Sequence, residues 1–253
     1  AAELAASADL VLDLEPLERG WSIPWTARQL GAKTFVHVAY PRALADPAVK
    51  ARRDLMRLSC RELELEFVEL ETPDPAAGKG PQAVYTFVSA RAPLWIGKYG
   101  KSAAFFAVDD VIAEPLMEAV KAYGGFFPET ARPSARTAFP FVFMLDPGLA
   151  DAPYAAALAA LEAAASKYGA AGRFGVWTAE LDAALAEAAA RAAFAVLDSG
   201  APIDAALVAR SLEASTPGEA WAVSAGFDFA ARAALPSLFG ARMDTWMLGK
   251  GAS

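Results

Sequence analysis

The sequence predicts an α/β protein in which mostly parallel strands form sheets flanked by helices. Short apolar runs rich in β-branched and aromatic residues alternate along the chain with longer helical segments. These strand candidates are continuously apolar, which is typical of parallel strands buried on both faces. Helices between successive strands then provide the right-handed crossovers that parallel sheets require.

The clearest unit of this kind runs from Gly31 to Leu63. Lys33–Ala39 is an apolar run that predicts a buried strand, and Tyr40–Asp46 is the polar loop that leaves it. Asp46 followed by Pro47 predicts a helix start, because a carboxylate can cap free N–H groups and proline has a helical φ.

Arginine is unexpected on the apolar face of the helix that follows. Arg53 shares three- and four-residue spacing with Met56 and Cys60. Ligands of open α/β sheets bind outside the carboxyl ends of the strands. We therefore predict a ligand site in which Arg52 or Arg53 stands beside His37 and Tyr40.

The rest of the chain continues the alternation of strands and helices. Asp151 and Pro153 predict the start of a helix that runs to Tyr168, and Leu181–Leu197 is an alanine-rich helix. Further strands are expected at Asp9–Asp13, Leu63–Leu70, Ser102–Val108, Thr137–Leu145 and Phe174–Thr178, the fourth of them broken by Pro140.

Composition excludes several functional classes. The net charge of −7 argues against a nucleic-acid-binding surface, which requires a basic stripe. One cysteine and one histidine exclude an internal disulfide and a Cys- or His-rich metal site, so we predict neither metal nor cofactor. No run reaches the roughly 18 uninterrupted apolar residues of a membrane span.

Asp109 and Asp110 form the second candidate site, directly after the buried strand Ser102–Val108. One of the two can cap the helix that follows, but two adjacent carboxylates exceed what one cap needs. The other can accept hydrogen bonds from hydroxyl or amine donors of a ligand. Trp177, at the end of a later strand, is a third candidate, as part of an aromatic stacking wall.

Catalytic motifs are absent from the sequence. It contains neither the GxSxG nucleophile motif nor the HExxH zinc motif. We therefore expect no enzymatic activity. An α/β enzyme that uses Asp109 or Asp110 as a general base remains an alternative, since such a role requires a raised pKa that sequence does not reveal.

The order LVLDLEPLERGWSIPWTARQLGAKTFVHVAYPR, then ARRDLMRLSCRELELEFVEL, resembles type I periplasmic solute-binding proteins and LacI-type sensor domains. The motifs GAKTFVH, ARRD, AFF, EPL and GRFG are closest to an uncharacterised bacterial family of this bilobed fold, described as regulators or lipoproteins. The resemblance implies that Arg52 or Arg53 and the pair Asp109–Asp110 contact ligand. It also places Trp177 in the cleft.

The resemblance further implies a division of the chain. Residues 1–16 would be a remnant of a largely missing first lobe, and residues 17–172 the second lobe. Residues 173–235 would return to the first lobe, and residues 236–253 would make the final crossing.

The implied function is non-catalytic binding of a small polar molecule by hinge closure. Mixed Arg and Asp side chains suit a sugar-, nucleoside- or amino-acid-like ligand. A membrane transporter or receptor would be the partner of a periplasmic or cell-surface lipoprotein. The alternative is the cytoplasmic effector-sensing domain of a transcription regulator, which would not itself contact nucleic acid.

Overall fold

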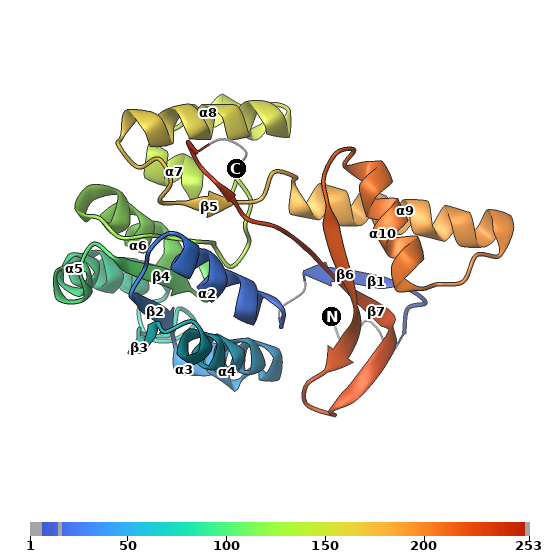
Figure 1. Cartoon of the computed structure of the whole chain (residues 1–253), viewed down its shortest axis with the longest axis horizontal. Helices are drawn as coiled ribbons and strands as arrows, with labels where there is room; N and C mark the ends of the chain where they lie inside the picture. The colour runs from blue at the N-terminus through green and yellow to red at the C-terminus, as the bar shows by residue number, and fades with distance from the viewer. Residues whose placement is uncertain (1–6, 15–16, 251–253) are drawn as a thin grey trace. The chain divides into compact units, whose positions relative to one another are not determined.

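The computed structural model describes residues 7–14 and 17–250, so residues 1–6 and 15–16 of the predicted first-lobe remnant lie outside the description. The chain forms two compact units. One comprises residues 1–19 and 179–244, and the other comprises residues 20–178 and 245–253. The chain therefore passes between units after residues 19, 178 and 244. Figure 1 labels the elements of both.

The unit of residues 20–178 and 245–253, called unit 2, is built on the parallel sheet β3-β2-β4. Its strands are β2 (Thr34–Ala39), β3 (Glu66–Glu71) and β4 (Ala103–Ala107). Single parallel bridges from Ala104 to Phe126 and from Phe127 to Phe174 continue the sheet toward the antiparallel pair β5 (Gly175–Val176) and β8 (Trp246–Met247). The strands predicted around Gly31–Leu63 and Ser102–Val108 are confirmed.

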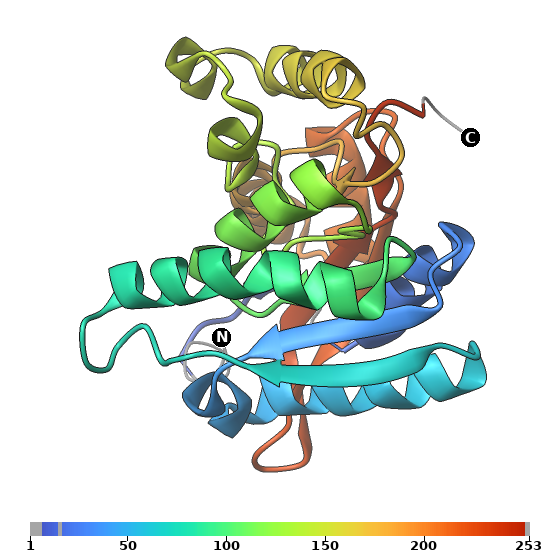
Figure 2. The ribbon, with the colours of Figure 1, turned by 90° about the vertical axis from the view of Figure 1, so that its left-hand side faces the viewer.

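Helices cover both faces of this sheet (Figures 1 and 2). On one face, α2 (Arg19–Gln29) and α4 (Pro47–Glu62) pack on Phe35 and Phe106. On the other, α5 (Pro81–Tyr99) and α6 (Asp110–Tyr123) pack on alternate strand residues such as Val36 and Phe105. Because successive side chains of a strand point to opposite faces, β2 and β4 are buried at every position.

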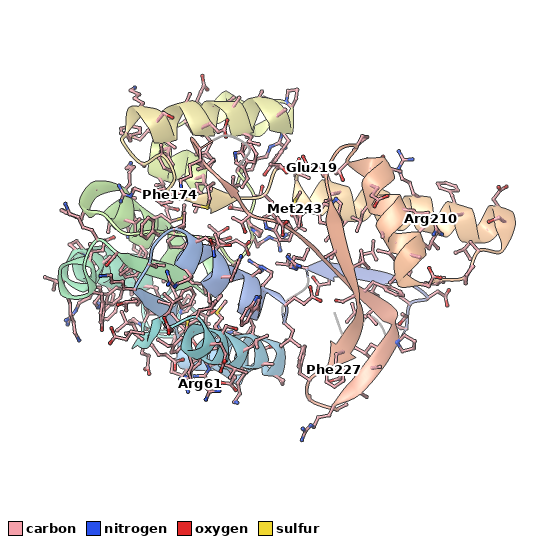
Figure 3. All side chains as sticks on the ribbon, in the orientation of Figure 1. Arg61, Phe174, Arg210, Glu219, Phe227 and Met243 are labelled. Atoms are coloured by element: carbon pink, nitrogen blue, oxygen red, sulfur yellow. The ribbon has the colours of Figure 1, made fainter. Side chains whose placement is uncertain are left out.

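The carboxyl-terminal part of unit 2 contains helices where we predicted a strand. It comprises α7 (Phe139–Phe143), the 3₁₀ helix η1 (Pro147–Ala150) and α8 (Tyr154–Lys167). The predicted strand Thr137–Leu145 is wrong, because Pro140 fits the first turn of a helix, where no N–H is needed. Phe139, Val142 and Phe143 are buried at three- and four-residue steps, and the rings of Phe139 and Phe143 each form a T-shaped contact with Phe174, which Figure 3 labels.

The other unit, unit 1, has the sheet β1-β7-β6. β1 (Val11–Leu14) runs parallel to β7 (Ala233–Met243), which forms an antiparallel pair with β6 (Trp221–Asp228). The helix α9 (Leu181–Ser199) buries alanines at four-residue steps and packs against β1 and α10 (Ala205–Ser215).

In unit 2, α3 (Pro41–Ala45) is a single turn that follows β2.

Candidate functional site

The carboxyl ends of the parallel strands of unit 2 share one edge of the sheet, because parallel strands end on the same side. Ligands of open α/β sheets bind outside this edge. We call it the carboxyl edge. Its side chains come from the segments that follow β2, β3, β4, the bridge residue Phe127 and β5: Tyr40, Arg42, Asp74, Asp109, Asp110, Glu129 and Trp177.

Asp109 caps α6, as one of the two aspartates was predicted to do. Its Oδ1 accepts a hydrogen bond from the backbone N–H of Val111 at 3.1 Å. Its Oδ2 accepts from the hydroxyl of Tyr40 at 3.0 Å. Both carboxylate oxygens of Asp109 therefore have protein donors.

Tyr40 and Arg42 join the ends of three strands. The Arg42 guanidinium lies over the Tyr40 ring at 5.4 Å and forms a two-bond ion pair with Asp74, at 2.7 and 2.9 Å. Burial and the hydrogen bond to Asp109 raise the pKa of Tyr40 to about 12, so its hydroxyl keeps its proton. This network holds the ends of β2, β3 and β4 in place.

Asp110, the neighbour of Asp109, is used differently. Its side chain is half-buried, and its Oδ1 is shielded from solvent without a hydrogen-bond donor among the described residues. Burial and the charge of Asp109 raise the pKa of Asp110, and the nearby Arg132 opposes the rise. Of the two predicted carboxylates, Asp110 is therefore the one with an acceptor left for a ligand.

Arg53 is engaged by carboxylates within the protein. Its Nη1 donates to both oxygens of Glu69 at 2.7–2.8 Å, and its Nε lies 2.8 Å from Asp54. Arg52 is buried, with its guanidinium 5.3 Å from the centre of the Phe106 ring. The two arginines of α4 are thus accommodated differently, Arg53 by the carboxylate of Glu69 on β3 and Arg52 by the Phe106 ring of β4.

His37 is fully buried between two rings. The Phe67 and Phe106 centroids lie 6.1 and 5.9 Å from the imidazole, and neither ring nitrogen forms a hydrogen bond within the described chain. Glu69 Oε1 is 3.9 Å from Nδ1, beyond hydrogen-bond reach. Burial and then the charges of the nearby arginines lower the pKa of His37 to about 3, so the side chain is neutral.

Trp177 is fully buried and does not form an exposed stacking surface. Its Nε1 donates to Glu129 at 3.0 Å. Glu129 is 1% exposed and was missed at the sequence level. The only signal in the sequence is that Glu129 lies two residues after the aromatic pair Phe126–Phe127. This pair forms single bridges rather than a full strand, so no predicted strand end marked Glu129 as a candidate.

The structure therefore brings the predicted residues together as two sets. Tyr40, Asp109, Asp110 and Trp177 lie at the carboxyl edge, whereas Arg52 and Arg53 of α4 lie near His37 of β2. Across residues 7–14 and 17–250, no group of three or more His, Cys, Asp or Glu side chains is arranged to hold a metal ion. No helix in these ranges has the length and apolar character needed to cross a membrane.

A solved structure described as a "Putative transcriptional regulator" from Clostridium difficile 630 is similar to this chain with a TM-score of 0.83 and 20% identity. The match covers 97% of this chain and 69% of the other. This likeness confirms the predicted fold class, an α/β fold with mostly parallel sheets flanked by helices.

Two curated proteins of Treponema pallidum (strain Nichols), both described as "Uncharacterized protein", are similar in sequence. One is 38% identical over 122 residues, covering 48% of this chain and 56% of the relative. The other is 41% identical over 70 residues, covering 28% and 32%. The matches therefore span about half and one third of the lengths of these relatives.

A family model described as "Protein of unknown function (DUF3798)" matches residues 1–175, well over half of the chain. This chain belongs to the DUF3798 family.

Proposed function

We propose that this chain is a binding domain that takes up a small polar molecule at the carboxyl edge of unit 2 without transforming it. One observation carries the proposal: Asp110 presents a buried carboxylate oxygen that has no donor among residues 7–14 and 17–250, while both oxygens of Asp109 are engaged. A buried acceptor of this kind is costly unless a partner satisfies it.

The chemistry of Asp110 selects the class of ligand. A carboxylate is an acceptor and carries negative charge, so it favours a hydroxyl or ammonium group. The guanidinium groups of Arg42 and Arg53 are already paired with Asp74 and Glu69. This balance supports a sugar-, nucleoside- or amino-acid-like ligand rather than a simple anion.

Binding through hinge closure is the mechanism that we propose. Two compact units joined by three passages of chain suit a protein whose ligand stabilises a closed state. We propose two alternative physiological settings for this binding. In one, the domain delivers its ligand to a membrane transporter or receptor outside the cytoplasm. In the other, it is the effector-sensing domain of a transcription regulator, which the description of the Clostridium difficile structure favours.

Native mass spectrometry of the protein purified from its own host tests the proposal. The unmodified protein should carry a small molecule that Asp110→Asn loses. Asp146→Asn is the matched control, because Asp146 caps η1 and belongs to neither set of candidate residues. Titration with the identified molecule should show at least about tenfold weaker binding by Asp110→Asn, the loss of one charge-assisted hydrogen bond.

Equal retention of the molecule by Asp110→Asn and the unmodified protein would refute the proposed site. The mass of the molecule should stay unchanged during incubation with the protein. A change of mass that Asp109→Asn or Asp110→Asn abolishes would instead identify an enzyme that uses one of these carboxylates as a base.

A further inference from the structure

Glu129 connects two segments that are far apart in the sequence. Its Oε2 accepts hydrogen bonds from Trp177 Nε1 at 3.0 Å and from Thr245 Oγ1 at 2.6 Å. The Glu129 side chain is 1% exposed, so both bonds are shielded from water. One buried carboxylate oxygen thus ties residue 177 to residue 245.

Both donors stand where the chain passes between units. Unit 2 ends at Thr178 and resumes at Thr245. Trp177 is therefore the residue before the last one of unit 2 on the outgoing passage, and Thr245 is the first residue on the return. Within unit 2, Glu129 holds together the ends of two of the three passages.

The backbone around Glu129 reinforces this connection. β5 and β8 pair antiparallel, with Val176 opposite Trp246. A Cβ added to Gly175 would lie 1.9 Å from the carbonyl oxygen of Pro128, so only glycine allows β5 to approach the Pro128–Glu129 segment this closely. This close approach places the Glu129 carboxylate within hydrogen-bond reach of its two donors.

We propose that Glu129 is a positioning residue that clamps residues 174–177 and 245–248, so that the two segments open and close as one body. The clamp is a property of unit 2 and does not depend on the proposed ligand. If unit 2 takes part in hinge closure, the chain bends after residue 178 and before residue 245, and Glu129 holds the unit 2 ends of both passages in place. Glu129 is not among the site residues that were predicted from the sequence.

Two backbone amides report on the clamp. The N–H of Trp177 donates to the carbonyl of Pro133 at 2.9 Å, and the N–H of Leu248 donates to the carbonyl of Phe174 at 2.9 Å. Amides in such bonds exchange with solvent only when the structure opens locally. The Trp177 bond joins the 174–177 segment to residue 133, so exchange at Trp177 measures release of that segment. The Leu248 bond joins the two clamped segments to each other, so exchange at Leu248 measures their separation.

Hydrogen exchange of the full chain, with and without Thr245→Val, is the test. Valine removes the hydroxyl donor at nearly constant volume. The clamp predicts that exchange of the Trp177 amide, whose residue keeps its own bond to Glu129, speeds up about tenfold together with that of Leu248, while the amides of β2 are unchanged. Glu129→Leu removes both acceptor oxygens, so it should speed both amides at least as much, and Thr245→Val should add little in the Glu129→Leu protein.

Glu162→Gln is the matched control. Trp246 Nε1 donates to Glu162 at 2.5 Å, so this variant loosens β8 from α8 without touching Glu129. It should speed exchange at Leu248 more than at Trp177. The clamp is refuted if Thr245→Val speeds exchange at Leu248 alone, at neither amide, or equally throughout unit 2. These readings require no ligand, so they fail or succeed separately from the proposed function.

Discussion

Replacement of Asp109 by alanine should destabilise the protein by about 2.5–4 kcal/mol, whereas the same replacement of adjacent Asp110 should not. Asp109 caps α6 through the N–H of Val111, and loss of such a cap costs about 1 kcal/mol. It also accepts from the Tyr40 hydroxyl, and a hydrogen bond to a charged group contributes roughly 1.5–3 kcal/mol. The two terms give the expected range.

Asp110 makes no comparable contribution to the free energy of unfolding. Its position in the first turn of α6 favours a negative charge by about 0.3–1 kcal/mol, but its Oδ1 is buried without a described donor, which opposes this gain. Asp110→Asn should therefore change the free energy of unfolding by less than about 1 kcal/mol near neutral pH.

The pH dependence of this variant has a definite sign. The pKa of Asp110 is raised from 3.8 in the folded protein, so the unfolded state loses its proton first as pH rises. The protein therefore loses stability as pH rises from 3.8 through the raised pKa. Asn cannot titrate, so the stability of Asp110→Asn relative to the unmodified protein should fall as pH is lowered from 7 toward 4.

Urea denaturation followed by circular dichroism measures these differences. Tyr40→Phe is the matched partner, because it removes only the hydroxyl that donates to Asp109. In a double-mutant cycle, Asp109→Ala and Tyr40→Phe should show a coupling energy of at least about 0.5 kcal/mol. Equal destabilisation by Asp109→Ala and Asp110→Ala would refute the assignment of the cap and the network to Asp109.

Two further predictions concern the core under α4. His37→Phe should raise the free energy of unfolding by up to about 1 kcal/mol at pH 7, because it removes two buried nitrogens that have no hydrogen-bond partner in the described part of the chain, and it keeps the ring stack. The stability of His37→Phe relative to the unmodified protein should increase as pH falls from 6.5 toward 3. The reason is that His37 gains a proton in the unfolded state but, with a folded pKa of about 3, not in the folded state. A smaller stability difference at pH 5 than at pH 7 in urea titrations would contradict this. Burial raises the pKa of Cys60 to about 12, so a thiol reagent should label it at least about 100-fold more slowly in native protein than in urea. Comparable labelling rates would show that Cys60 is accessible.

Local sequence patterns were sufficient for β2, β4 and the start of α4. The run Thr34–Ala39 contains β-branched and aromatic residues, which favour a strand, and all six of its residues are buried. The Asp46–Pro47 pair starts α4 because its cap involves only residues two and three positions away. The same short range explains why the sequence predicted that one of Asp109 and Asp110 caps α6.

Patterns shared by two structures misled the prediction. The segment around Pro140 is apolar, and apolarity alone does not separate a short strand from one turn of helix. The structure chose α7 because Phe139 and Phe143 both pack against Phe174, a residue more than 30 positions away. Such contacts leave no local trace.

The sequence by itself determined the α/β class, the strand ends that carry polar groups, and the pair Asp109–Asp110 as a candidate. Only the tertiary structure decided which aspartate has an acceptor left, that Glu69 engages Arg53, and that Glu129 joins Trp177 to Thr245. The physical reason is range. Caps and strand propensities depend on neighbours in the chain, whereas the availability of a buried polar atom depends on donors that only folding brings within hydrogen-bond reach.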